Sequence, residues 1–146
     1  MTEQTTRLVL PSHIEAVGET AAAVTDFVKS CGFDEQTAFG VDMALREAVT
    51  NAVVHGNQED ETKSVEVIFS CLGNALEIEI RDQGEGFDPV DVPDPVAGDN
   101  LLRQSGRGVF LMKTFMDEFA VRRLESGTEV TLVKNLVPNE IPNSSV

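Results

Sequence analysis

Basic residues are scarce in this sequence, which has 11 Lys and Arg against 25 Asp and Glu over 146 residues, a formal net charge of −14. Proteins that bind nucleic acid directly gain affinity by neutralising phosphates with Lys and Arg, so this balance argues against that class. A bound nucleotide would need local compensation from a metal ion, a helix terminus or a few cations. The acidic excess fits either simple solubility or a partner with a basic surface, and charge alone does not decide between them.

Long apolar runs are also absent. No segment approaches the roughly 18 apolar residues of a membrane-spanning helix. The first residues lack the basic-then-apolar order of a signal peptide, so we expect a cytoplasmic protein without membrane contact. The two cysteines, Cys31 and Cys71, have neither metal nor redox spacing, and we expect buried free thiols rather than a disulfide. The length fits one domain over residues 1–137, followed by a disordered tail over 138–146.

Two helices are predicted in the first half of the chain. The first is expected over residues 12–30, with Ser12 as its N-cap and apolar residues at helical spacing, namely Ile14, Val17, Ala21, Val24 and Val28. The second begins after Asp34, a suitable N-cap, and runs to about His55. Gly56 would then end it as a left-handed residue.

Alternating segments predict five strands, at residues 7–10, 63–71, 75–81, 118–124 and 129–134. Pro11 would stop the first, which reads as an edge strand, and Gly73-Asn74 would turn a hairpin between the second and third. A short helix is expected over 108–116. Residues 88–104 show no periodicity and contain three prolines and four aspartates; we interpret them as a mobile lid, the alternative being a disordered linker. This order of elements predicts an α+β layered sandwich.

The first motif with chemical potential lies on the second predicted helix. Glu47, Asn51 and His55 are spaced by four and therefore share one stripe. That stripe borders an apolar one expected to face the sheet, formed by Val41, Leu45, Ala48, Val49 and Ala52. The amide oxygen of Asn51 suits Mg²⁺, and Glu47 could accept a proton from a group that attacks a γ-phosphate. Taken alone, Glu47 is better explained as a surface carboxylate, and His55 as a residue that favours the end of a helix.

The second motif is Asp82-Gln-Gly84-Glu-Gly86, directly after a predicted strand. A carboxylate at Asp82 can accept a hydrogen bond from an adenine amino group. Gly84 and Gly86 would let the backbone pass close to the base and permit positive φ angles. The alternative is a tight acidic turn, because Asp and Gly are the usual turn residues.

The third motif, Gly106-Arg-Gly108, opens a predicted helix, where free N–H groups and the positive end of the helix dipole favour phosphate. Arg103 and Arg107 could add positive charge. The alternative is a glycine-rich helix entry with surface arginines. Other nucleotide signatures fail: the P-loop pattern is absent, and neither glycine pair has the third glycine of the dinucleotide fingerprint.

In this order and spacing, and with Gly127-Thr128 on the last hairpin, the three motifs resemble the GHKL ATPase superfamily. Within it, residues 46–56 and 105–112, followed by Phe115-Met-Asp117, are similar to the bacterial anti-sigma factor serine/threonine kinases. The resemblance spans about residues 7–134. It implies the Bergerat fold, a two-layer sandwich in which a mixed β-sheet carries helices on one face and ATP lies between the helices and the lid.

The resemblance also implies roles for individual residues. Glu47 would be the catalytic base and Asn51 the Mg²⁺ ligand. Asp82 would bind adenine with help from Thr128. The remaining nucleotide-binding residues would be Gly84, Gly86, Arg103, Gly106, Arg107 and Gly108.

A protein of this kind phosphorylates a Ser or Thr of a small antagonist protein and captures or releases a sigma factor accordingly, often as a homodimer. One departure concerns Gln104, where some members carry an arginine for phosphate or partner contacts; Arg103 or Arg107 would have to replace it. Two other functions stay open. The protein could be a nucleotide-gated binding module that sequesters a partner without phosphorylating it, or an α+β interaction domain that binds no nucleotide. The sequence does not name the partner.

Overall fold

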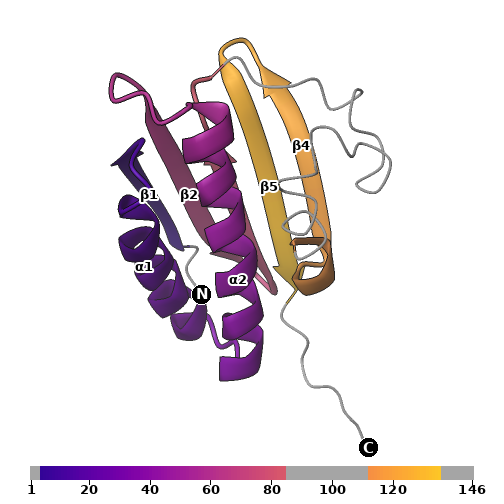
Figure 1. Cartoon of the computed structure of the whole chain (residues 1–146). Helices are drawn as coiled ribbons and strands as arrows, with labels where there is room; N and C mark the ends of the chain where they lie inside the picture. Colours follow the sequence, from indigo (N-terminus) through magenta and orange to yellow (C-terminus); the bar gives the residue numbers. More distant parts are fainter. Residues whose placement is uncertain (1–3, 85–111, 136–146) are drawn as a thin grey trace, which may run out of the picture.

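The computed structural model describes residues 4–84 and 112–135 (Figure 1). The predicted lid, the first four residues of the helix predicted over 108–116, and the tail lie outside these residues. The described elements follow in the order β1 (Gln4–Pro11), α1 (Ala16–Ser30), α2 (Glu35–Asn51), the π-helical turn η1 (Ala52–Gly56), β2 (Ser64–Leu72), β3 (Ala75–Arg81), β4 (Glu118–Leu124) and β5 (Gly127–Asn135). Residues 112–115 form one helical turn before β4.

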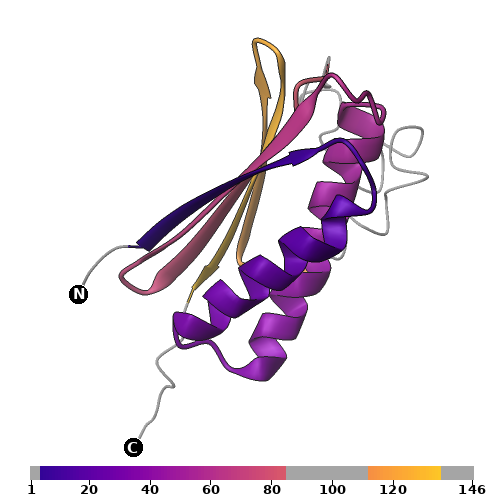
Figure 2. The ribbon, with the colours of Figure 1, turned by 90° about the vertical axis from the view of Figure 1, so that its left-hand side faces the viewer.

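The five strands form one sheet in the order β1-β2-β3-β5-β4, and both helices lie on the same face of it (Figures 1 and 2). The α+β class and the edge position of β1 are confirmed. The expectation of a mixed sheet was wrong for the described strands, because all four pairings are antiparallel. β1 and β2 are joined by two helices that run in opposite directions, which brings the chain back antiparallel to β1 (Figure 2). Tight turns make the β2–β3 and β4–β5 pairs antiparallel as well.

The core lies between the sheet and the helices. β3 alternates strictly, with Leu76, Ile78 and Ile80 buried on the helix side. The apolar stripe predicted on the second helix is confirmed in full, since Val41, Leu45, Ala48, Val49 and Ala52 are all buried. On α1 the prediction holds for Val17, Ala21, Val24 and Val28. Ile14 is instead 45% exposed, because it precedes the first turn of the helix.

The predicted start of the first helix was wrong. The helix begins at Ala16, and its N-cap residue Glu15 makes no capping hydrogen bond. Ser12 is fully buried and its hydroxyl donates to the backbone oxygen of Lys63, 2.7 Å away. The hydroxyl oxygen in turn accepts from the side-chain amide of Asn57 at 2.9 Å, and the helix begins four residues after Ser12, so tertiary contacts have replaced the local cap.

A row of alternating charges crosses the sheet on the face opposite the helices. The guanidinium of Arg81 lies 2.7 Å from the carboxylate of Glu129 and 3.7 Å from that of Glu66. Arg122 pairs with Glu129 at 3.0 Å, and Arg7 pairs with Glu66. Glu129 is buried beneath its two arginines, so its charge is compensated on both sides. The row joins all five strands, and it occupies part of the face that the helices leave uncovered.

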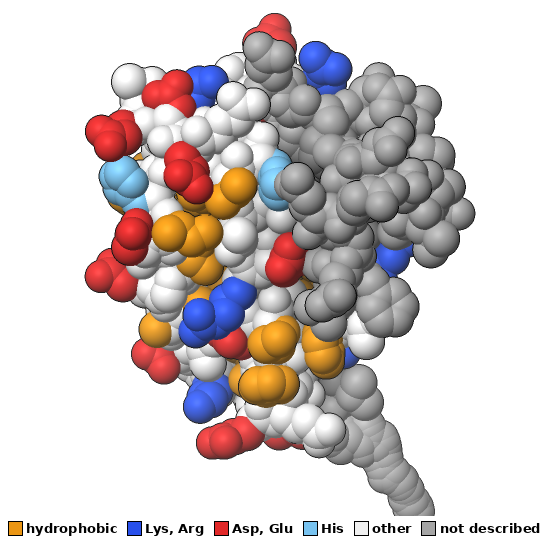
Figure 3. All heavy atoms as spheres, in the orientation of Figure 1, with side chains coloured by type: hydrophobic (Ala, Val, Ile, Leu, Met, Phe, Trp, Pro, Cys, Tyr) orange, Lys and Arg blue, Asp and Glu red, His pale blue; other side chains and the backbone are white. Residues whose placement is uncertain are grey.

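The helical face of the described residues carries scattered acidic side chains, and its apolar side chains form small groups rather than a continuous band (Figure 3). The largest exposed apolar side chain there is Phe39 on α2, 62% exposed. Neither helix of the described chain has the length and apolarity needed to cross a membrane.

Candidate nucleotide site

Asp82 is a buried carboxylate directly after β3, with only 7% of its surface exposed. Its Oδ1 atom accepts hydrogen bonds from the backbone N–H of Gly84 at 3.1 Å and of Thr128 at 3.0 Å. Its own N–H donates to the carbonyl of Thr128, which ties the end of β3 to the start of β5. Burial raises the pKa of Asp82, and the two N–H donors and the charge of Lys63 oppose that rise. The carboxylate is therefore fixed in position within a partly desolvated site.

Three glycines from three separate segments surround this carboxylate. A methyl group on Gly56 would overlap Oδ2 of Asp82 and lie 2.5 Å from Cγ. A methyl group on Gly84 would overlap the carbonyl of Gly56, and one on Gly127 would overlap the carbonyl of Asp82. Gly127 also has a φ of 116°, which side chains strongly disfavour. Gly84 is therefore in close contact with the backbone of Gly56, whereas its predicted close approach to a base stays a prediction.

The end of the second helix differs from the prediction. Instead of an α-helix that stops at a left-handed Gly56, the chain forms the π-helical turn η1, in which Asn57 N–H bonds the carbonyl of Ala52 at 2.8 Å. Gly56 is not among the residues with positive φ. Position 56 requires glycine because the carboxylate of Asp82 occupies the space that a side chain there would need. π-Turns within helices occur often at functional sites.

Asn57 is a positioning residue that the sequence analysis missed. It is 1% exposed, and its amide nitrogen donates to Ser12 Oγ and to the carbonyl of Ser64, each at 2.9 Å. Its amide oxygen accepts from the N–H of Gln83 at 2.7 Å. One side chain thereby fixes the residue next to Asp82 to the end of the helix and to the start of β2. No sequence spacing signals this role, because the partners are 7, 26 and 45 residues away.

Thr128 places an unsatisfied hydroxyl beside Asp82. The residue is 2% exposed, and its Oγ1 has no hydrogen-bond partner among the residues that the structure describes. In the register of β5 it shares the face of Val130 and Leu132, the face on which the helices lie. Buried polar atoms are rarely left without a partner, so this hydroxyl is a position where a ligand atom is expected.

Glu47 and Asn51 lie on α2, before the glycine that touches Asp82. Asn51 precedes Gly56 by five residues and Glu47 precedes it by nine, so Asn51 lies nearer to Asp82 along the helix. Both side chains are partly exposed, so they border the core without entering it. Burial raises the pKa of Glu47, and the positive charge of His55 opposes the rise. His55 thus acts on Glu47 electrostatically, in addition to its predicted place at the helix end.

The structure therefore brings Asp82, Gly84 and Thr128 together, with Glu47 and Asn51 along the adjoining helix. The other predicted site residues lie outside the described residues: Gly86, Arg103, Gly106, Arg107 and Gly108.

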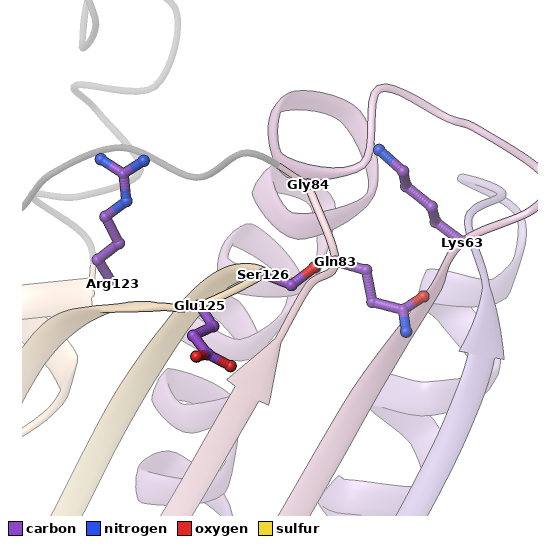
Figure 4. A pocket seen from close by; sticks show the side chains of 6 residues that line it. All are labelled: Lys63, Gln83, Gly84, Arg123, Glu125 and Ser126. Carbon is purple, nitrogen blue, oxygen red and sulfur yellow. The ribbon is translucent and has the colours of Figure 1, made fainter.

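A shallow pocket of about 450 Å³ adjoins this site at Gly84 (Figure 4). It is lined by Lys63, Gln83, Gly84, Arg123, Glu125 and Ser126. Lys63 rises on one side of Gln83 and Gly84 and Arg123 on the other, each with its charged end directed outward (Figure 4). These cations supply positive charge beside the carboxylate in a strongly acidic chain, and neither was predicted as a site residue.

Comparison with known proteins places this arrangement in a family. The family model described as the histidine kinase-like ATPase domain matches residues 10–134, which includes all of the described site. The chain therefore belongs to the family of histidine kinase-like ATPase domains, and ATP is the nucleotide that this family implies.

Within that family, the chain is similar to serine-protein kinases named RsbW. The protein from Bacillus licheniformis is 33% identical over 132 residues, which cover 86% of this chain and 82% of the relative. The protein from Bacillus subtilis (strain 168) is 29% identical over 133 residues, with 87% and 82% covered. The solved structure of the RsbU and RsbW domains of a Mycobacterium tuberculosis protein matches 98% of this chain and 34% of that longer chain, with a TM-score of 0.65 and 18% identity. The last similarity supports the fold alone.

Proposed function

We propose that this protein is an ATP-dependent serine/threonine protein kinase that regulates a partner by phosphorylating a small antagonist protein. The observation that carries the proposal is the arrangement around Asp82: a buried, fixed carboxylate beside a threonine hydroxyl with no partner among the described residues, and three glycines packed closely around them. The similarity to serine-protein kinases over most of the chain supports the choice of phosphoryl transfer rather than binding alone.

Adenine is the base that fits the described end of the site. Oδ1 of Asp82 accepts from two backbone donors, whereas Oδ2 accepts no hydrogen bond from the described residues and lies against the backbone of Gly56. The exocyclic amino group of adenine is a donor that a carboxylate can accept from. The Thr128 hydroxyl can donate to a ring nitrogen, or it can donate to or accept from a bridging water. The two groups together recognise a ligand that offers a donor and an acceptor side by side.

The helix positions of Asn51 and Glu47 suit the phosphate end. In the described residues no group of three or more His, Cys, Asp or Glu side chains could hold a metal ion. A magnesium site built on the Asn51 amide oxygen would therefore take its other ligands from phosphates and water, as Mg²⁺ commonly does. Bound Mg²⁺ would neutralise developing phosphate charge. We assign phosphate contacts to Arg103, Gly106, Arg107 and Gly108, and close backbone approach to the base to Gly84 and Gly86, as the motif pattern implies.

Glu47 is the proposed catalytic base. The hydroxyl oxygen of the substrate Ser or Thr forms a bond to the γ-phosphorus, the bond to the ADP oxygen breaks, and the hydroxyl proton passes to Glu47. Partial burial raises the pKa of Glu47 and so makes its carboxylate a stronger base than a fully solvated one. The charge of His55 opposes that rise in the pKa of Glu47.

The substrate and regulatory partner are proposed from the family resemblance of the sequence motifs. We infer a small antagonist protein of the anti-anti-sigma type as phosphoacceptor, a sigma factor as the regulated protein, and a homodimer as the assembly. The second candidate is a nucleotide-gated module that sequesters its partner without phosphorylating it. We retain this second candidate because the residues proposed to hold the triphosphate lie outside the described part of the chain.

Label transfer distinguishes the two. The protein is incubated with Mg²⁺ and γ-labelled ATP, with and without the cognate antagonist, as wild type and as Glu47→Gln. Glu35→Gln is the matched control, because Glu35 lies on the same helix with its side chain 91% exposed. Transfer that Glu47→Gln abolishes and Glu35→Gln preserves supports the kinase. ATP binding without transfer in the wild type favours the gated module, and no ATP binding rejects both.

A further inference from the structure

The two cysteines of the chain, Cys31 and Cys71, lie at one junction between α1 and β2. Cys31 follows the last residue of α1, and its N–H bonds the carbonyl of Phe27 at 3.1 Å, which places it one turn beyond that ring. Cys71 follows Phe69 by two residues on β2 and therefore shares its face. Phe27 and Phe69 are in edge-to-face contact, with ring centroids 4.9 Å apart.

The geometry of helix and strand brings the two sulfurs together. Four residues of α-helix advance about 6 Å, and two residues of strand advance about 6.6 Å. Beginning from the Phe27–Phe69 contact, both steps arrive at neighbouring positions. In keeping with this placement, the Cys71 thiol is one of the causes that raise the pKa of Cys31. Both are free and partly exposed, so a small oxidant can reach them.

We propose that Cys31 and Cys71 are an oxidisable pair that forms an intramolecular disulfide when the folded protein meets a hydroperoxide. The closed loop would contain about 40 residues, including all of α2 and η1. The pair lies at the end of the sheet opposite Asp82, since Cys71 pairs with Leu76 at the start of β3. Oxidation would therefore join α1 to the sheet without occupying the candidate nucleotide site, and the inference does not depend on kinase activity.

The two sulfurs have different roles in the proposed reaction. Burial first, then the hydrogen bond and the charge of the Cys71 thiolate, raise the pKa of Cys31 to about 12. A raised pKa disfavours the thiolate of Cys31, so we assign the first attack to Cys71: its sulfur, as thiolate, attacks one peroxide oxygen to form a sulfenic acid while hydroxide leaves. Cys31 then attacks the sulfenic sulfur to form the S–S bond, and water leaves. In sum, two thiols lose two electrons and two protons, and one hydroperoxide is reduced to water and, for hydrogen peroxide, a second water.

The test uses reduced full-length protein treated with hydrogen peroxide under native conditions. Intact mass should fall by two hydrogen atoms, and non-reducing peptide mapping should show a Cys31–Cys71 cross-link that dithiothreitol reverses. The loop closure should raise the transition temperature by roughly 8 to 15 °C.

Cys31→Ser and Cys71→Ser are the controls. Each removes the only partner, so neither should show the mass loss or the rise in transition temperature. A wild-type product that gains oxygen atoms, or that is cross-linked between two chains, would overturn the proposal. So would an intramolecular cross-link that lowers the transition temperature, because it would show that the two sulfurs are not positioned for each other in the folded state.

Discussion

Gly56→Ala tests the close packing of Gly56 against Asp82. The added carbon would lie 2.5 Å from Cγ and 3.0 Å from Cβ of Asp82, where carbon atoms ordinarily approach to about 3.5 Å. Either the carboxylate or the helix end must move by about 1 Å. The carboxylate is held by Gly84 and Thr128, and the helix end by the buried amide of Asn57. A shift of the carboxylate or of the helix end would therefore break hydrogen bonds.

Two losses should follow. Overpacking of a fixed site costs about 1 to 3 kcal/mol of unfolding free energy. A displaced carboxylate also loses its hydrogen bond to the base, and a hydrogen bond to a charged group is worth about 1.5 to 3 kcal/mol, so the affinity for ATP should fall roughly 10- to 150-fold. Urea unfolding followed by circular dichroism measures the first loss, and titration calorimetry with ATP measures the second.

Gly18→Ala is the control. Gly18 lies in α1 and is exposed, and an added methyl group would meet nothing within 4 Å. Alanine should therefore stabilise the helix by about 0.5 to 1 kcal/mol and leave ATP affinity unchanged. If Gly56→Ala unfolded at the wild-type urea midpoint and bound ATP with wild-type affinity, the close contact between Gly56 and Asp82 would be refuted.

Three further results are expected. Asp82→Asn, which keeps an acceptor for its two backbone donors, should weaken adenine nucleotides about 10-fold more than tripolyphosphate, and equal losses would remove Asp82 from base recognition. Because burial raises the pKa of Asp82, the charged form costs stability above that pKa, so the neutral variant should unfold at the same or a higher urea concentration at pH 7. His55→Gln removes a charge that lowers the pKa of Glu47, so the acid limb of kcat against pH should move to higher pH; an unchanged limb, or one at lower pH, would contradict that coupling. Asn57→Ala leaves the Gln83 N–H and the Ser64 carbonyl without this partner and should cost about 2 to 4 kcal/mol in urea unfolding, whereas a loss below about 0.5 kcal/mol would show that water replaces the amide.

Periodicity predicted the elements well, because it records which face of a segment is buried. The α2 stripe from Val41 to Ala52 and the alternation of β3 both follow from the side chains of the segment itself. The Asp34 cap was predictable for the same reason: its side chain accepts from Thr37 N–H, three residues away. The direction of the strands was harder to predict from the sequence. A mixed sheet was expected, but the described strands are all antiparallel.

The details of the site could not be predicted from periodicity or local sequence patterns. The π-turn at η1 requires one additional residue between hydrogen-bonded groups, and nothing in Ala-Val-Val-His-Gly distinguishes it from an α-helix. Ser12 looked like a cap because that role is local, yet its partners are Lys63 and Asn57. Gly56 looked like a terminator for the same reason. In each case the deciding atom belongs to a distant segment, which single-segment patterns do not contain.

The shared position of Asp82 has a consequence for how the protein folds. Residues 4–84 contribute the carboxylate and Gly56, whereas the β4–β5 hairpin contributes Thr128 and Gly127. β3 and β5 are neighbours in the sheet although more than 40 residues separate Asp82 from Thr128, so their pairing closes a long loop and is expected to form late. The site around Asp82 and Thr128 is complete only after this pairing. A ligand that binds there would hold the β4–β5 hairpin against β3. Binding of that ligand would therefore show that the β3–β5 pairing has formed.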